Sequence, residues 1–137
     1  MTSVAPSRDA LVRLWLPVIV WAGVIFWLSA TPNLRIASAD NVDFVVRKAG
    51  HMGAFGVLAV LLWRVLAPAP WRLRGPALWG LAWVLTVAYA ASDECHQSFT
   101  AGRHPSLTDV GIDAAGAALF LVALAVWLQW WRGRATG

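Results

Sequence analysis

Polar and ionisable side chains gather in one stretch of this chain, between Ser92 and Gly116, with an apolar run on either side. Four of the seven carboxylates and two of the three histidines lie there: Asp93, Glu94, Asp109, Asp113, His96 and His104. Ionisable groups beside apolar, membrane-type segments are costly, so a concentration of them marks a candidate functional site. The first question is which chemistry these residue types could carry.

One interpretation is acid/base catalysis on a lipid-linked substrate. Carboxylates that are held close together hold protons more tightly, which a general acid or base requires. Asp93 or Glu94 would then be the acid/base, and His51, which lies earlier in the chain, would be its partner. This hypothesis makes the protein a membrane enzyme, although the residues name no reaction.

A second interpretation is a binding site for an anionic head group of a membrane lipid. Arg103, Lys48 and His51 would face phosphate, because a guanidinium fork and an ammonium group suit phosphate oxygens. The polar residues predicted to line such a binding site are Lys48, Arg103, Gln97, Ser106, Asp109 and Asp113.

A third interpretation is a divalent metal site. Glu94, His96, Asp109 and Asp113 could supply the oxygen-rich ligands that magnesium, calcium or manganese prefer. Apart from this possible cation no cofactor is expected, because the sequence has no Gly-rich phosphate loop, nucleotide fingerprint or His-Glu-x-x-His motif.

The alternative to all three is a structural ion-pair network. Membrane-buried charges pair with one another by necessity, so Arg103 with Asp93 or Glu94, and Lys48 with Asp109 or Asp113, could simply hold the helix ends together. Ser106 and Asp109 also fit an N-cap and its capping box. By the same reasoning His96 and His104 face solvent, and Cys95 is a packed thiol.

Composition indicates an integral membrane protein. Of the 137 residues 59% are hydrophobic and 13% are charged, whereas about a quarter of a soluble domain is charged. The length suits a single domain over residues 1–137. The net charge of +4 is explained by arginines that flank apolar runs, so nucleic acid is not an expected partner. With one cysteine, no intrachain disulfide can form.

Four apolar runs predict an all-α fold, a polytopic four-helix transmembrane bundle. The expected helices cover approximately residues 11–30, 44–66, 77–99 and 106–131, each near the length that spans a bilayer. The first run could also be a cleaved signal peptide, but three further runs favour a retained helix. Gly50, Gly53 and Gly56 recur at every third residue and are expected to pack against another helix.

The positions of basic residues predict that both termini are cytoplasmic. With four spans the inner side would hold seven basic residues, Arg8, Arg13, Arg64, Arg72, Arg74, Arg132 and Arg134. The outer side would hold four, namely Arg35, Arg47, Lys48 and Arg103. Basic residues are enriched on the cytoplasmic side, and tryptophans near the inner helix ends agree with an aromatic belt there. Trp21 and Trp27 do not fit the belt and are expected to pack against other residues.

Helical spacing places the site residues on shared faces. One face of the second helix carries Lys48, His51 and Phe55. One face of the fourth helix carries Ser106, Asp109, Asp113 and Gly116. Antiparallel packing through short loops would bring both faces to the outer end of the bundle.

These motifs together resemble the VanZ-like membrane protein family, which is named for a teicoplanin-resistance protein. The resemblance rests on Ser92-Asp93-Glu94-x-x-Gln97, Gly102-Arg103-x-x-Ser106-x-x-Asp109, Gly116, Lys48-x-x-His51 and Ser29. Asp113 departs from it, because many relatives have Asn there. The resemblance implies a protein of the bacterial cytoplasmic (inner) membrane, acting near cell-envelope lipids or a lipid-linked cell-wall precursor and linked to glycopeptide resistance. It implies no established reaction.

Overall fold

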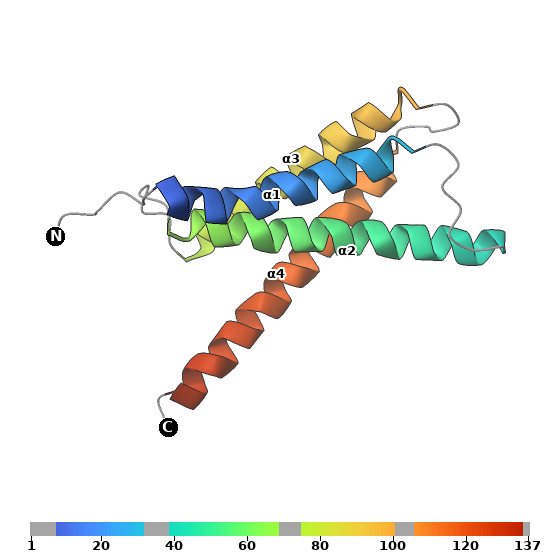
Figure 1. Ribbon diagram of the computed structural model, residues 1–137. Helices are drawn as coiled ribbons and strands as arrows, with labels where there is room; N and C mark the ends of the chain where they lie inside the picture. Colours follow the sequence, from blue (N-terminus) through green and yellow to red (C-terminus); the bar gives the residue numbers. More distant parts are fainter. Residues whose placement is uncertain (1–7, 32–38, 69–74, 101–105, 136–137) are drawn as a thin grey trace.

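The computed structural model describes residues 8–31, 39–68, 75–100 and 106–135, and within these ranges it confirms an all-α fold. The four helices are α1 (Arg8–Ser29), α2 (Asp40–Leu66), α3 (Pro76–Gln97) and α4 (Leu107–Ala135). Successive helices run in broadly opposite directions, so that the start of α1 and the end of α4 lie on the same side of the molecule (Figure 1).

The helix boundaries differ from the predicted ones by a few residues, mostly at α2 and α4. Helix α2 begins at Asp40 rather than at residue 44, because acidic groups in a first turn interact favourably with the helix dipole. Asp43 adds an ion pair to Arg47 one turn later, at 2.9 Å. At the other end of the chain, α4 continues to Ala135, with Arg132 and Arg134 in its last turn.

Three of the four helices are long and apolar enough to cross a membrane: α1, α2 and α4. Helix α3 is not among them in the described residues, since its last two turns carry Asp93, Glu94, His96 and Gln97. The chain is therefore compatible with a multi-pass membrane protein, and a fourth span through α3 stays a prediction.

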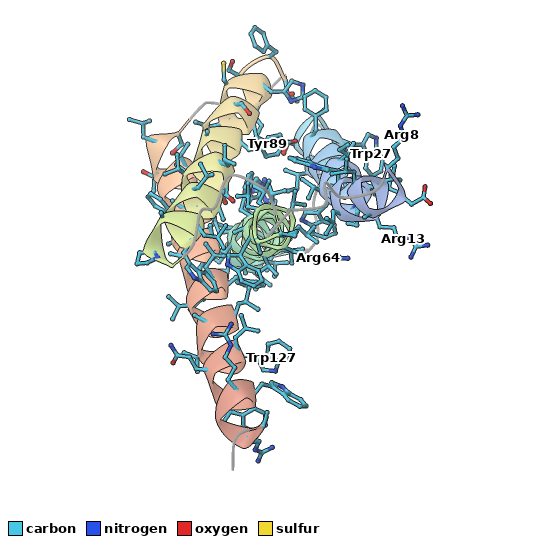
Figure 2. The ribbon with its side chains drawn as sticks, turned by 90° about the vertical axis from the view of Figure 1, so that its left-hand side faces the viewer. Arg8, Arg13, Trp27, Arg64, Tyr89 and Trp127 are labelled. Carbon is cyan, nitrogen blue, oxygen red and sulfur yellow. The ribbon has the colours of Figure 1, made fainter. Side chains whose placement is uncertain are left out.

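Three aromatic side chains join different helices by hydrogen bonds to backbone carbonyls. Trp21 of α1 donates to Ala54 at 2.9 Å, and Trp83 of α3 donates to Ala114 at 3.0 Å. Tyr89 of α3 points towards α1, where its hydroxyl donates to the carbonyl of Ala22 at 2.7 Å (Figure 2). Each bond satisfies an aromatic N–H or O–H donor with a carbonyl of another helix, and so links a helix pair.

The expectation for the two outlying tryptophans is thus half correct. Trp21 packs between helices, whereas Trp27 is 68% exposed and lies on the outside of α1 (Figure 2). A bilayer would cover an indole there, so an apolar environment does not require contact with another helix.

Helices α2 and α4 form the closest crossing in the bundle. A Cβ atom on Gly116 would lie 2.4 Å from the carbonyl oxygen of Met52, and one on Gly56 would lie 2.4 Å from the ring of Phe120. Small residues allow such close approach of helix backbones. Gly50 and Gly53, by contrast, would have no neighbouring atom within 4 Å of an added Cβ, so the expectation that they pack is wrong.

Beyond this crossing, the C-terminal half of α4 runs away from the other helices (Figure 1). Several of its large apolar residues are exposed, namely Val122, Val126, Trp127, Trp130 and Trp131. Trp127 is labelled in Figure 2. Exposed apolar surface of this extent fits contact with lipid.

We expect Gly116→Ala to destabilise the bundle, because its methyl group would collide with the backbone of Met52, which cannot move aside as a flexible side chain could. Overpacking of this kind costs about 1–3 kcal/mol. The matched control is Gly111→Ala, in the same helix, where the new Cβ meets no atom within 4 Å and helix propensity improves by at most about 1 kcal/mol. Thermal unfolding in detergent should lower the melting temperature of the first variant only; equal values would contradict the crossing.

Candidate functional site

Two contacts between basic and acidic side chains connect α2 to α4 just before their crossing. The ammonium group of Lys48 contacts the carboxylate of Asp109, and Nδ1 of His51 lies 3.5 Å from Oδ2 of Asp113. Because the pairs are one helical turn apart on each helix, they use the faces that the sequence places together. Of the two partners expected for Lys48, the structure selects Asp109.

Glu94 brings α3 to the same site. Its carboxylate is 7% exposed and accepts a hydrogen bond from the backbone N–H of Ser106, at 2.7 Å. Ser106 immediately precedes α4, where unpaired N–H groups attract a negative charge. Glu94 therefore holds the end of α3 against the start of α4. Ser106, predicted as a binding residue, contributes its backbone to this contact.

Asp93 connects α3 to α1. Its Oδ2 atom accepts hydrogen bonds from the hydroxyl of Ser29, at 2.7 Å, and from the amide of Gln97, at 2.9 Å. All three side chains are buried, with 3–4% of each residue exposed. The predicted residues Asp93 and Gln97 are thus joined to the last residue of α1.

Electrostatic interactions unite these contacts into one polar cluster. The charges of Asp109, His51 and Lys48 act on Glu94. Asp113 in turn lies near enough to Asp109 and Asp93 to interact with both. We call this set of residues the polar cluster: Ser29, Lys48, His51, Asp93, Glu94, Gln97, Ser106, Asp109 and Asp113. The described parts of all four helices contribute to it, whereas the sequence motifs had centred it on α2, α3 and α4.

Two oxygens of the polar cluster are buried without a hydrogen-bond partner in the structure. They are Oδ1 of Asp93 and Oδ1 of Asp113. Burying a polar atom in this way is costly, so each such atom calls for an explanation.

Other candidate residues lie apart from these contacts. His96 stacks on the ring of Phe26, with centroids 3.8 Å apart, and does not simply face solvent. Cys95 is exposed, so its expected packing as a buried thiol is wrong. Arg103 and His104 lie outside the described residues. Within the described ranges no three His, Cys, Asp or Glu residues are arranged to hold a metal ion, and Glu94, His96, Asp109 and Asp113 form no such group.

Sequence reasoning missed the contact of Ser29 with Asp93. The available signal was a polar residue at the end of an otherwise apolar run, which the family resemblance had already noted. The catalytic, binding and metal-ligand roles of the polar cluster stay predictions.

The described chain is all-α, is compatible with a multi-pass membrane protein, and gathers ionisable residues from several helices at one end. The family model described as VanZ/LLP1 matches residues 14–128, which is most of the chain. The chain belongs to the VanZ/LLP1 family. No curated protein and no solved structure matches it.

We expect Lys48 and Asp109 to be energetically coupled. Each side chain is only about a quarter exposed, at 26% and 27%, so removing one partner leaves the other charge poorly solvated. Lys48→Met or Asp109→Asn alone should destabilise the fold by about 1–3 kcal/mol. The double variant should lose less than the sum of the two, as detergent unfolding would measure. Strict additivity would mean that the two groups do not interact.

Proposed function

We propose that the protein binds the anionic head group of an envelope lipid at its polar cluster. The observation that carries this proposal is the position of Lys48, a cation between α2 and α4 that is neither fully buried nor free in solvent. A phosphate group could approach its exposed part and compete with Asp109. In the absence of a ligand, Asp109 supplies the negative charge that Lys48 requires.

The neighbourhood of Lys48 supports a site that can exchange one anion for another. The ammonium group lies 5.4 Å from the centre of the Phe44 ring, so part of its surroundings is apolar. An ammonium group in such surroundings interacts more strongly with an anion than one in open water. Arg103 is the second proposed phosphate contact on the basis of its sequence position.

An apolar groove supports an amphiphilic ligand rather than a soluble one. It lies between α3 and α4, measures about 410 Å³, and is lined by Trp79, Trp83, Leu121 and Ala125 among other apolar residues. Trp83 also donates its hydrogen bond to Ala114, which follows Asp113 in sequence. A site for a hydrocarbon chain within a turn or two of a charged site suits a lipid.

We place the polar cluster at the outer face of a bacterial inner membrane, with both termini cytoplasmic. The basic residues favour this orientation, and the start of α1 and the end of α4 lie on the same side of the molecule (Figure 1). A lipid-linked cell-wall precursor is the ligand that would connect such a site with glycopeptide (teicoplanin) resistance.

The proposed orientation predicts opposite labelling of two helix ends. In a Cys95→Ser background, a cysteine replacing Thr31, after α1, should react with a membrane-impermeant thiol reagent in intact cells. A cysteine replacing Ala67, after α2, should react only once the membrane is permeabilised. The reverse pattern would overturn the orientation, and equal labelling would mean that α2 does not cross the membrane.

The head-group proposal predicts that Lys48→Gln weakens binding of an anionic lipid. Loss of one partly exposed charge contact corresponds to about 1 kcal/mol, or about fivefold in Kd. Phosphatidylglycerol and phosphatidylcholine bound to the purified protein can be counted by native mass spectrometry. The matched control is Arg64→Gln, which removes the same charge from the other end of α2. An equal loss in both variants would indicate general surface attraction, and no loss in Lys48→Gln would refute the proposed site.

A further inference from the structure

Two carboxylates of the polar cluster have a feature that head-group binding does not explain. Asp93 and Asp113 are each only 3% exposed, yet Oδ1 of each has no hydrogen-bond partner. An ionised carboxylate so deeply buried requires compensation at both oxygens. Each Oδ1 atom therefore needs a nearby cation or a bound proton, in addition to the contacts that the structure shows.

The contacts of Asp93 are unevenly divided between its two oxygens. Oδ2 accepts two hydrogen bonds, from Ser29 and from Gln97, while Oδ1 accepts none. This division fits a neutral carboxyl group better than a carboxylate, because a neutral oxygen without a partner costs less to bury than a charged one. Asp113 shows a similar division, because only its Oδ2 faces His51.

The surroundings favour a proton over a larger cation. Both Oδ1 atoms are inaccessible to solvent, and the described residues contain no group of three or more ligands suited to a metal ion. A sodium ion or an ammonium group would need space and several further oxygen ligands. A proton needs neither.

We infer that Asp93 and Asp113 together bind one proton inside the helix bundle. The two residues interact electrostatically, and like charges that are buried close together cannot both ionise without a large penalty. The proton therefore belongs to the pair rather than to one residue. This site is independent of the head-group proposal, because neither oxygen needs a lipid.

The neighbouring groups from each helix fit a single proton on the pair. Asp113 faces His51 from α2, Asp109 from its own helix and Asp93 from α3. Asp93 faces Tyr89 from its own helix and the uncharged Ser29 from α1. Lys48 is paired with Asp109, and Glu94 accepts a hydrogen bond at the start of α4. His51 is therefore the group placed to offset the one negative charge that remains on Asp93 and Asp113. His51, half-buried beside Asp113, is also the residue through which the proton can exchange with the polar end.

Infrared spectroscopy of the full-length protein in phosphatidylcholine vesicles tests this inference. A protonated carboxyl group has a C=O stretching band that is separate from the carboxylate bands and shifts in D2O. We expect this band at neutral pH in the wild-type protein and its loss on raising the pH. Asp93→Asn and Asp113→Asn should each abolish it, because the remaining carboxyl then ionises alone. Circular dichroism would verify that both variants remain helical.

The controls separate the pair from other carboxylates. Asp9→Asn, at the exposed start of α1, should leave the band unchanged. Loss in only one of the two Asn variants would place the proton on that carboxyl alone and would overturn the sharing between the two residues. Absence of the band in the wild-type protein, its full retention in both Asn variants, or its loss in Glu94→Gln would overturn the inference. Loss of the band on adding sodium chloride in place of potassium chloride would overturn it too, by indicating a sodium site.

Discussion

The backbone contact between α2 and α4 at Met52 and Gly116 is the constraint on which the rest of the structure depends. No side chain larger than hydrogen fits at position 116, so the two helices can cross at only one depth and one register there. His51 directly precedes Met52, and Asp113 lies one turn before Gly116, so this crossing places the ion pairs of the polar cluster. A wider crossing would separate Lys48 from Asp109 and His51 from Asp113.

Around this crossing, the cost of burying charge is distributed over the described parts of all four helices. Lys48 and His51 of α2 lie against the carboxylates of Asp109 and Asp113 of α4. The carboxylate of Glu94 accepts a hydrogen bond from the N–H group of Ser106. One oxygen of Asp93 accepts hydrogen bonds from Ser29 of α1 and from Gln97. Buried ion pairs contribute little net stability compared with apolar packing. The two oxygens left without partners show where the compensation is incomplete.

The aromatic hydrogen bonds act as a second, weaker set of constraints. Trp21, Trp83 and Tyr89 each donate to a carbonyl on another helix, and these bonds hold α1 and α3 against the α2–α4 crossing. Away from the polar cluster the helices diverge, and the C-terminal half of α4 leaves the bundle (Figure 1). Lipid can cover the apolar surface that this divergence exposes.

The sequence by itself determined the four helices, the polar end and the two faces that carry Lys48, His51, Asp109 and Asp113. These follow from local periodicity and from the length of the apolar runs, which depend on neighbours in the chain. The exact start of α2 was less certain, because Asp40 and Asp43 are polar residues that suit either a loop or a first helical turn.

Only the tertiary structure decided which partners meet across helices. The sequence allowed Lys48 to pair with Asp109 or Asp113, and nothing local could join Asp93 to Ser29, 64 residues away. It also could not distinguish Gly56 and Gly116, which meet another helix, from Gly50 and Gly53, which do not. Partner choice of this kind depends on the depth and direction of helix crossings, which are set by packing of all the helices together and not by the spacing within one of them.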